Sequence, residues 1–577
     1  MSASDEKPPA GGQLRRIVPK LLASVLPLAM LLLWTIVALA VGGSSRPTAL
    51  HVRDFVGSIS VKSTVAGAVK LGGSGGGGGG RWISAYTVPN FTSTLLSRWL
   101  TPGGEPCRET LTAAVSIPAF DSSPASSPAL LHAGELHELA FFALDESNRH
   151  RCLGGDYFEA DLSGPQWKSR PPILDHGNGS YSLRLQIHSR FASPNSTFTL
   201  SIVLLFRRFD GLKLSTNRFA FRRELRRISI KFDPPSAAFP TLPNLQICRA
   251  GAGDFSGTAW SGRWTRLAGN DSCAVDRDGR YRCLPETVPC SPPWCGGGAP
   301  LAALESNGWV YSAHCAFRLF DQISAWRCLH GHWLLFWGDS NHVDTIRNLL
   351  TFVLGIADGD AIAAVTRRFD RRFVNPLNAS ESLRITNIFN GHWNETQNYL
   401  GLASLAHQPF RDLVRRYFDN PGGGAPDVVV LNSGLHDGVY WRSIRHFAQG
   451  AEFAAKFWEE LLAGVRRWLP ARAPRVFYRR TIAAGGYARE LGFNPSKMEA
   501  FDGVFLEKLT ARGAITGGVV DEFDMTFPWH YDNRCNDGVH YGRKPARARW
   551  RDGEIGHQYF VDLMLVHVLL NAFCNGW

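Results

Sequence analysis

The sequence lacks closely spaced cysteine pairs: none of its eleven cysteines forms a C-x-x-C motif, and none precedes position 107. Structural zinc sites usually draw on such pairs, so the spacing favours disulfide bonds and an oxidising compartment. We expect bridges among the cysteines of Cys248–Cys328 and a further bridge between Cys535 and Cys574. The alternative is a zinc ion held by the irregularly spaced Cys273–Cys295 group. Because disulfides are the favoured interpretation, we predict no metal site, and we also predict no bound cofactor. The odd number of cysteines leaves at least one of them unpaired within the chain.

The sequence also lacks a concentrated basic segment, although its net charge is +12. Its arginines are dispersed as pairs, such as Arg207-Arg208 and Arg479-Arg480, and are not interleaved with aromatic residues in one block. Nucleic-acid-binding proteins typically gather such residues on one face or along one helix. With 44% hydrophobic and 19% charged residues, the composition excludes wholesale disorder. We predict that the chain binds no nucleic acid and that its basic surface faces anionic glycans or a membrane.

Charge is absent from one stretch near the N-terminus, between Lys20 and Arg46. Within it, Leu21–Val41 is almost wholly apolar, close to the roughly 20 residues that a membrane-spanning helix needs. Basic residues precede this segment, so the positive-inside rule predicts a cytoplasmic tail at 1–20, a signal anchor at 21–41 and a lumenal body. The alternative is a cleaved signal peptide, because Ala38-Leu39-Ala40 resembles a cleavage site. All N-glycosylation sequons follow the apolar segment and agree with a lumenal body: Asn90, Asn178, Asn195, Asn270, Asn378 and Asn394.

Glycine and alternating patterns divide the next part of the chain. Residues 42–100 contain an unbroken glycine run at 75–80 and are predicted to form a flexible stem. Residues 105–235 show a period of two, as in Tyr181–Ile187 and Phe198–Phe206, with turn residues before each run. Short alternating strands of this kind predict a β-sandwich, which we expect to act as a binding or spacing module.

Residues 245–577 change to strand signals that alternate with helix signals. Short apolar runs predict strands at Trp333–Trp337, Val428–Leu431, Val476–Tyr478 and Gly518–Val520. Helix-like segments lie between and after them, at His342–Leu354, Glu452–Trp468 and Tyr559–Phe573. This alternation predicts an α/β domain with a doubly wound parallel sheet, in which active sites lie at the carboxyl ends of the strands.

Ser340 stands at the first of these strand ends. The apolar run Leu334–Trp337 stops at Gly338, and Ser340 then opens a helix with an apolar inward face. A hydroxyl at the start of a helix lies near free backbone N–H groups, which stabilise a developing oxyanion. The alternative is that Asp339 and Ser340 only cap the helix.

Two further elements supply the other groups that acyl-transfer chemistry needs. After the strand Val428–Leu431, the side-chain amide of Asn432 and the backbone N–H of Gly434 are donor types used in oxyanion holes, although both residues are also common in turns. Near the C-terminus, Asp537 and His540 are three residues apart, so the carboxylate can orient the imidazole as a general base for Ser340.

These motifs resemble the PC-esterase branch of the SGNH/GDSL hydrolase-like superfamily. The resemblance rests on Gly338-Asp339-Ser340 and its approach from Trp309, and on the C-terminal run from Val520 through Asp537-Gly-Val-His540 to Cys574. That branch includes the trichome-birefringence-like O-acetyltransferases, a sialate O-acetyltransferase, and the neurexophilin and PC-esterase domain proteins, some of which carry an immunoglobulin- or filamin-like domain before the catalytic one. The block from Asn432 to Asp437 departs from both the hydrolase and the plant-enzyme patterns, which leaves the acyl acceptor open.

The resemblance implies a nucleophile at Ser340, a base at His540, an orienting acid at Asp537 and an oxyanion hole at Asn432 and Gly434. It implies a Golgi O-acyltransferase, acetyl in type, that acts on a glycan or glycoprotein and takes acetyl-CoA or an acyl carrier as co-substrate. A membrane partner that supplies the acyl donor is a further expectation. A carbohydrate esterase with the same triad is the alternative within the enzyme class, and a non-catalytic cell-surface binding protein is the alternative outside it.

Overall fold

The structure is a computed structural model that describes residues 81–574 with gaps. The gaps lie at 100–106, 108–109, 123–126, 194, 209–211, 213–219, 235–241, 250–252, 258–259, 267–273, 276–280, 283–307, 420–423, 544–547, 551–552 and 556–558. The predicted tail at 1–20 and signal anchor at 21–41 lie outside the described residues, as does the glycine run of the stem. Within the part that is described, no helix has both the length and the apolar character needed to cross a membrane.

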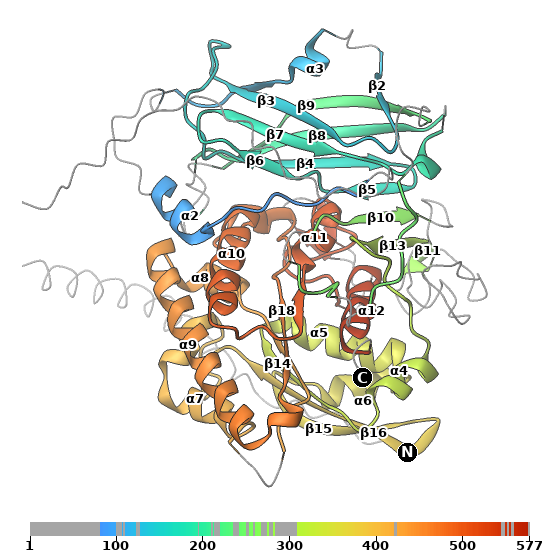
Figure 1. The fold of residues 1–577 in the computed structure, drawn as a ribbon, viewed down its shortest axis with the longest axis vertical. Coiled ribbons are helices and arrows are strands. Elements are labelled where there is room, and N and C mark those ends of the chain that lie inside the picture. The colour runs from blue at the N-terminus through green and yellow to red at the C-terminus, as the bar shows by residue number, and fades with distance from the viewer. Residues whose placement is uncertain are drawn as a thin grey trace, which may run out of the picture. The chain divides into compact units, whose positions relative to one another are not determined.

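The part of the chain predicted to be a sandwich forms two β-sheets (Figure 1). One sheet has the strand order β1-β3-β7-β6 and the other β13-β10-β5-β4-β8-β9-β2. The strand bounds are β1 Ala114–Ser116, β2 Ala129–His132, β3 His137–Leu144, β4 Tyr157–Gly164, β5 Trp167–Ser169, β6 Ile173–Asp175, β7 Ser180–Leu185, β8 Thr197–Phe206, β9 Ala220–Asp233, β10 Arg263–Arg266 and β13 Trp309–Ser312. The predicted strands around Tyr181 and Phe198 are therefore confirmed as β7 and β8.

One hydrophobic core lies between these two sheets. The alternate residues Tyr181, Leu183 and Leu185 of β7 belong to it, as do the alternate residues of β8 from Phe198 to Leu204, as the period of two requires. Phe141 of β3 and Tyr181 of β7 belong to the first sheet, and Phe158 of β4 in the second sheet packs edge-on against both, with ring centroids 5.2 and 4.9 Å apart. The two-sheet arrangement agrees with the prediction, whereas its immunoglobulin- or filamin-like type stays a prediction.

Two predicted boundaries differ from the structure. Helix α2 (Phe91–Trp99) lies within the range predicted to be a flexible stem, and the backbone amide of Thr92 donates to Glu507 of helix α10 (Pro495–Ala511) at 3.0 Å. In this part of the predicted stem, Phe91 and Leu95 pack on the hydrophobic core of the second predicted domain. The second sheet also continues beyond the predicted sandwich, since β10 and β13 follow residue 245. Two parts predicted as separate therefore share one sheet.

The second predicted domain contains a six-stranded sheet with the order β15-β16-β14-β17-β18-β19. Its strands are β14 Trp333–Gly338, β15 Arg368–Asn375, β16 Asn378–Phe389, β17 Val428–Leu431, β18 Arg475–Arg479 and β19 Gly518–Val520. All neighbouring pairs are parallel except β15 with β16, which is antiparallel. The prediction of a parallel sheet is confirmed, and the hairpin of β15 and β16 was not predicted.

Helices lie on both sides of this sheet (Figure 1). Their bounds are α4 Gln322–Leu329, α5 Ser340–Asn348, α6 Asp358–Ala364, α7 Gln408–Arg415, α8 Leu435–Tyr440, α9 Ile444–Trp468, α10 Pro495–Ala511, α11 Glu522–Thr526 and α12 Phe560–Cys574. The predicted helix at His342–Leu354 is α5 together with a π-helical turn, η5 (Leu349–Val353). Helix α12 is mostly apolar, since it is buried along almost its whole length.

The disulfides agree with the prediction only in part. Cys248 is bonded to Cys315, inside the group where bridges were expected. The predicted bridge between Cys535 and Cys574 is wrong, because Cys535 is buried with a free thiol and Cys574 is bonded to Cys328. Helix α12 packs against α4, and this contact brings Cys574 and Cys328 together. The cysteines at 273, 283, 290 and 295 lie outside the described residues.

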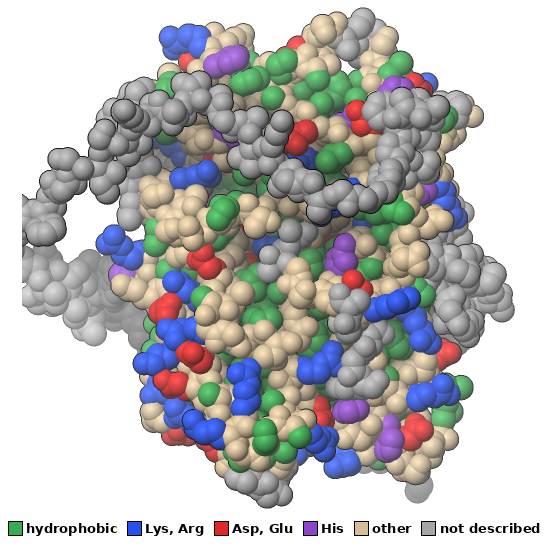
Figure 2. Space-filling model, viewed as in Figure 1, with side chains coloured by type: hydrophobic (Ala, Val, Ile, Leu, Met, Phe, Trp, Pro, Cys, Tyr) green, Lys and Arg blue, Asp and Glu red, His purple; other side chains and the backbone are tan. Residues whose placement is uncertain are grey.

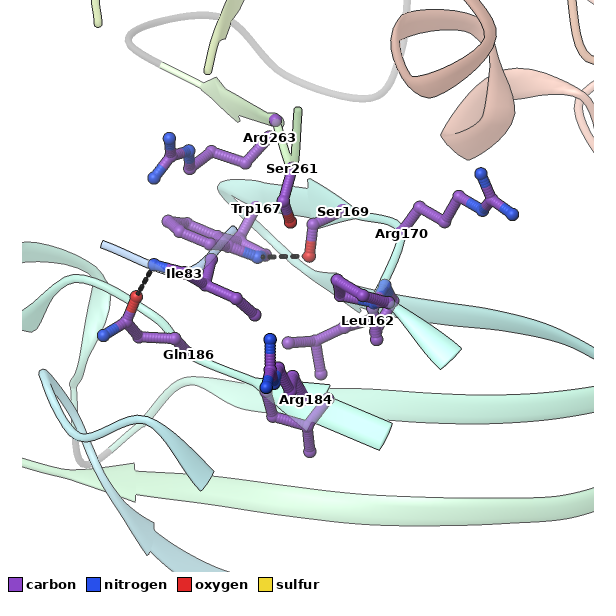
Figure 3. Close-up of a pocket in the computed structure, with 13 residues that line it drawn as sticks. Ile83, Leu162, Trp167, Ser169, Arg170, Arg184, Gln186, Ser261 and Arg263 are labelled. Atoms are coloured by element: carbon purple, nitrogen blue, oxygen red, sulfur yellow. Dashed lines mark hydrogen bonds between the residues drawn. The ribbon is translucent and has the colours of Figure 1, made fainter. Parts of the chain in front are cut away.

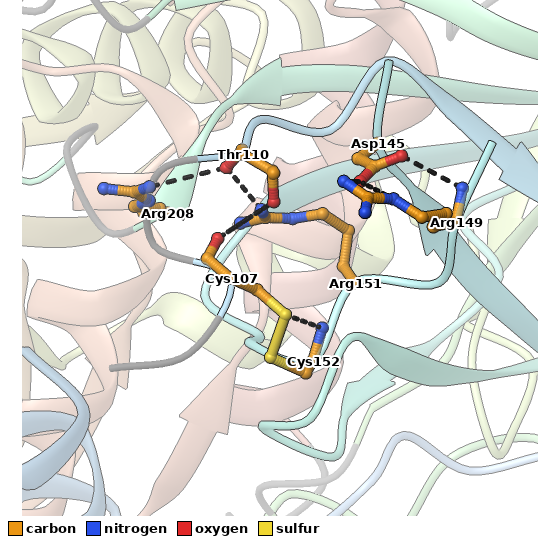
Figure 4. Close-up of a disulfide and its surroundings, with 7 residues drawn as sticks. All are labelled: Cys107, Thr110, Asp145, Arg149, Arg151, Cys152 and Arg208. Carbon is orange, nitrogen blue, oxygen red and sulfur yellow. Dashed lines mark hydrogen bonds and ion pairs between the residues drawn. A yellow bond between two sulfur atoms is a disulfide. The ribbon is translucent and has the colours of Figure 1, made fainter. Parts of the chain in front are cut away.

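A third disulfide joins Cys107 to Cys152 (Figure 4). The guanidinium of Arg151 donates beside it to the backbone carbonyls of Cys107 and Thr110. The bridge and these bonds fix the segment before β1 to the loop after β3.

On the face drawn in Figure 2, basic side chains are dispersed among acidic and hydrophobic ones. They do not gather into one patch on that face.

Candidate active site

Ser340 is placed by the way in which β14 ends. The strand is buried along its whole length and stops at Gly338, where a Cβ would lie 2.8 Å from the His342 ring and 3.1 Å from the Cβ of Asn432. Asp339 then caps α5, since its Oδ1 accepts from the amide of Asn341 at 2.9 Å. Ser340 is the first residue of α5, so its hydroxyl lies at the carboxyl edge of the sheet and at the positive end of the helix.

Ser340, His540 and Asp537 lie within hydrogen-bonding distance in series. The Ser340 Oγ lies 2.7 Å from His540 Nε2, although the residues are 200 positions apart. On the other side of the ring, His540 Nδ1 lies 3.0 and 3.1 Å from the two carboxylate oxygens of Asp537. His540 is 6% exposed, so the imidazole is shielded from most solvent. The hydroxyl, the imidazole and the carboxylate are thus arranged in the order that a serine nucleophile, a general base and an orienting acid have in acyl-transfer enzymes.

The loop that carries Asp537 holds its carboxylate in place. Its Oδ1 accepts from the backbone N–H groups of Val539 and His540 at 3.1 and 2.9 Å. Gly538 has a φ of +98°, a left-handed conformation that favours glycine, and its carbonyl accepts from Gly485 at 2.8 Å. The turn therefore fixes the carboxylate before any substrate binds.

Arg543 is a further residue of the site that the sequence did not indicate. Its Nη2 lies 2.8 Å from His540 Nε2 and its Nη1 lies 3.2 Å from Asp537 Oδ2. A guanidinium can only donate, so His540 Nε2 is an acceptor and the ring proton is on Nδ1, facing Asp537. This is the neutral tautomer that a general base needs. Arg543 follows His540 in an ordinary polar run, and nothing in the spacing marks it.

Asn432 and Gly434 lie at the same edge of the sheet, at the end of β17, the strand beside β14. Asn432 is buried, and its side-chain Nδ2 donates to the carbonyl of Arg479 at 3.0 Å. Since the amide nitrogen has two hydrogens, one remains for another acceptor. Gly434 precedes α8, and a Cβ there would lie 2.7 Å from the side chain of Thr481.

Asn390 and His436 form a second polar group at this edge. Asn390 follows β16, and its backbone N–H donates to the carbonyl of Gly338 at 2.8 Å. Its Oδ1 lies 2.7 Å from His436 Nδ1, and its Nδ2 donates to Ser433 Oγ at 3.2 Å. Burial lowers the pKa of His436 to about 4, so the ring is neutral near pH 7. In the sequence, His436 stands out only as part of an unusual block, and Asn390 directly follows the hairpin that was not predicted.

The order of the strands explains why these groups meet. In chain order, the parallel strands β14, β16, β17, β18 and β19 are arranged 2-1-3-4-5. The chain reverses its direction of winding between β14 and β17, and ligands in open α/β sheets bind at such a point. Ser340 and Asn432 follow these two strands, so both lie at the switch point.

The described residues offer no free set of metal ligands at the site. Asp254, His314 and Cys315 lie close enough together to share an ion, but they are elsewhere, and Cys315 is bonded to Cys248.

No protein-family model matches the chain, and no curated protein matches its sequence. Among solved structures, it is similar to LAE5, an α/β hydrolase enzyme from the metagenome of Lake Arreo in Spain. The identity is 12% and the TM-score 0.24, over 43% of this chain and 98% of the other. It is also similar to a mutant of Axe2, an acetyl-xylooligosaccharide esterase from Geobacillus. The identity is 12% and the TM-score 0.24, over 43% of this chain and 96% of the other. A third similar structure is Est24, a carbohydrate acetylesterase from Sinorhizobium meliloti. The identity is 15% and the TM-score 0.20, over 41% of this chain and 96% of the other. Likeness at this level assigns neither a family nor a function.

Proposed function

We propose that this chain transfers acetyl groups to hydroxyls of glycans or glycoproteins through a covalent acyl-serine intermediate. The observation that carries the proposal is the series Ser340–His540–Asp537, with 2.7 Å between Oγ and Nε2 and 3.0 Å between Nδ1 and Oδ1. Its position at the switch point of a 2-1-3-4-5 parallel sheet supports an enzyme of the SGNH/GDSL type, and the motifs around it support the PC-esterase branch.

The geometry supports a two-step reaction. Ser340 Oγ attacks the carbonyl carbon of the acetyl donor while its proton moves to His540 Nε2, where it replaces the hydrogen bond from Arg543, and Asp537 stabilises the resulting imidazolium. The amides at the start of α5, with Asn432 and Gly434, are the proposed donors to the oxyanion. The intermediate collapses to acetyl-Ser340, and the leaving group takes the proton from His540.

In the second step, His540 removes a proton from a sugar hydroxyl, which attacks the acetyl-serine. The acetyl ester of the sugar is released, and Ser340 recovers its proton from His540. The co-substrate is an acetyl donor such as acetyl-CoA or an acyl carrier, supplied by a membrane partner. If water replaces the sugar in this step, the same triad makes the chain an esterase.

We further propose that the body of the protein is lumenal in the Golgi, behind a single N-terminal anchor. The disulfides support an oxidising compartment. Every sequon asparagine that the structure describes is exposed, as glycosylation requires: Asn90, Asn178, Asn195, Asn378 and Asn394. In sealed microsomes, the body should resist added protease and lose mass when N-glycans are removed. A protease-sensitive, unglycosylated body would contradict this topology.

The catalytic proposal is tested with the purified full-length chain and variants of the triad. Labelled acetyl-CoA and p-nitrophenyl acetate serve as donors, with a panel of deacetylated glycans as acceptors. Ser340→Ala and His540→Ala should each lower kcat by roughly 10⁵- to 10⁶-fold, and Asp537→Asn by roughly 10⁴-fold. The double variant of Ser340 and His540 should lose little more than either single one, because the triad acts as a unit.

The matched control is Ser93→Ala, which removes an exposed hydroxyl that donates only to the carbonyl of Asn90. Intact-mass measurement should find one acetyl group on the wild type and on this control, and none on Ser340→Ala. Full activity of Ser340→Ala would refute the mechanism. Release of acetate without acetylated glycan would favour the esterase, and no acyl-enzyme with any donor would favour a binding protein.

A further inference from the structure

A cavity with aromatic and polar walls lies on one face of the sandwich's larger sheet, and none of the triad residues lines it. It has a volume of about 370 Å³, within the range of roughly 300–1,000 Å³ that is usual for ligand pockets. Its aromatic walls are Trp82, Trp167 and Phe191, and its polar lining includes Arg263, Thr265 and Ser312. None of these residues takes part in the proposed acetyl transfer.

The strand register brings the polar residues together. Arg263 and Thr265 are two apart on β10, so their side chains lie on the same face of the sheet. Arg263 lies directly opposite Ser312 on β13, and Thr265 lies directly opposite Trp167 on β5. Side chains opposite each other on neighbouring strands are in reach of one another, so this face of three adjacent strands forms a single surface.

Arg263 is buried without a hydrogen-bonding partner. It is 2% exposed, and none of its three guanidinium nitrogens has a hydrogen bond within the described structure. Its guanidinium lies over the ring of Trp82, with Cζ 4.0 Å from the ring centroid. Buried cations are normally paired, as Arg479 is with Glu522 at 2.6 Å. An unpaired buried guanidinium is a strong donor that lacks an acceptor.

Asp524 is the carboxylate whose charge acts on Arg263, but its hydrogen bonds go to other groups. Asp524 accepts from the amide of Gly262 and from the Tyr311 hydroxyl, both at 2.6 Å, and makes no ion pair with Arg263. Burial lowers the pKa of Arg263 to about 10, so the group is still a cation near pH 7.

Two hydroxyls in the same cavity also lack partners. Thr265 Oγ1 and Ser312 Oγ are buried and have no hydrogen bond within the described structure. The indole of Trp167, by contrast, is satisfied, because its Nε1 donates to Ser169 Oγ at 2.9 Å. Figure 3 draws a neighbouring pocket that shares Trp167 and Arg263 with this cavity, and it shows this bond, with the guanidinium of Arg263 extending past the indole. The unmet hydrogen-bonding capacity is therefore concentrated around Arg263.

The cavity is positive, because no aspartate or glutamate is among the described residues that line it. Arg190 contributes a second cation to the lining. Burial, Arg190 and Arg263 together lower the pKa of His188, which also lines the cavity. The described lining therefore offers cationic groups to an anion and no acidic group that would repel it.

We propose that this cavity binds an anionic saccharide, with its carboxylate or sulfate group on Arg263. A planar guanidinium binds such groups through paired N–H donors. Thr265 and Ser312 hydrogen-bond to the sugar hydroxyls, and the aromatic residues enclose the ring. This site is a second glycan-binding site on the chain, and it does not depend on the catalytic role of Ser340.

The test measures binding to the purified full-length chain by isothermal titration calorimetry. The probes are tetragalacturonate, a sulfated galactotetraose, neutral galactotetraose and inorganic sulfate. Wild type should bind at least one charged tetrasaccharide about tenfold or more tightly than the neutral one. Arg263→Gln should raise that Kd by roughly 10- to 100-fold, because a charge-assisted hydrogen bond is lost. Ser340→Ala should bind as wild type does.

Arg371→Gln is the matched control, because it removes the same charge from an exposed position of β15 and should leave Kd unchanged. Binding of tetragalacturonate alone identifies a carboxylate ligand, and binding of the sulfated sugar alone identifies a sulfate. Thr265→Val and Ser312→Ala keep the cation and should each weaken binding, so they test the site even if Arg263→Gln does not fold.

Three results would overturn the proposal. They are equal binding of neutral and charged tetrasaccharides, inorganic sulfate binding as tightly as the sugars, and no binding of any charged sugar to the wild type. Unchanged Kd in both Thr265→Val and Ser312→Ala, with a folded Arg263→Gln that still binds, would also overturn it.

Discussion

Replacing Glu159 with glutamine tests how strongly the sandwich is tied to the loop that leads to the triad. Glu159 lies on β4 and is completely buried. Its carboxylate accepts from Arg489, lies 3.2 Å from His530 Nε2 and accepts from the Tyr531 hydroxyl at 2.9 Å. These partners lie far from it in sequence, and Tyr531 belongs to the loop that ends in the turn of Asp537. A single carboxylate thus joins two parts that were predicted as separate domains.

The magnitude follows from two independent estimates. Burial alone would raise the pKa of Glu159, but Arg489 and His530 outweigh it and hold the pKa at about 2, against an ordinary value of 4.5. That difference corresponds to about 3 kcal/mol of stability at neutral pH. Removing one partner of a buried ion pair costs about 3–5 kcal/mol in other proteins, because the second charge is left uncompensated. We therefore expect Glu159→Gln to lower the free energy of unfolding by about 3 kcal/mol.

The pH dependence gives a second readout with a defined sign. Since the folded pKa of Glu159 is depressed, its stabilisation is complete above the unfolded value of 4.5 and is lost as the pH falls towards 2. The difference in stability between wild type and Glu159→Gln should be constant above about pH 5 and shrink below 4.5. Urea unfolding of the full chain, followed by tryptophan fluorescence from pH 7 to pH 3, measures it.

The control is Glu138→Gln on β3, which breaks an exposed ion pair with Arg184 at 3.3 Å. Exposed pairs of this kind contribute about 0–1 kcal/mol, so this variant should unfold almost as wild type does. The reasoning is refuted if Glu159→Gln loses no more stability than Glu138→Gln. It is refuted equally if the loss at pH 7 persists unchanged at pH 3.

Two further predictions concern the disulfide of α12 and the proposed oxyanion hole. Cys328→Ser opens a bridge between residues 246 positions apart and should lower stability by about 2–5 kcal/mol, which a lowered Tm in thermal melting would show and an unchanged Tm would contradict. Asn432→Ala should lower kcat for acetyl transfer by roughly 10²- to 10³-fold with little change in KM, because its donor acts in the transition state. A folded Asn432→Ala variant with wild-type kcat would remove this side chain from the proposed mechanism.

Much of the α/β part could be predicted because its signals are local. The apolar runs that became β14 and β17 are buried on both faces, as central parallel strands are, so they are continuous in the sequence. The hairpin of β15 and β16 was missed because it carries many charged and exposed residues and offers no such run. The partner of Cys574 was mispredicted because the packing of distant helices, which local sequence does not show, brings Cys574 to Cys328.

By itself, the sequence determined the features that lie within one turn or one strand. The three-residue spacing of Asp537 and His540 places carboxylate and imidazole together, and the glycine before Asp339 and Ser340 marks where a strand ends and a helix begins. The tertiary structure alone decided which distant segments meet. Ser340 and His540 are 200 positions apart, and the order of the strands in the sheet brings them together. Local propensities do not encode that order. For the same reason, the unpaired Arg263 became visible only when β5, β10 and β13 were side by side, because a charge is recognised as unpaired only after every neighbour is known.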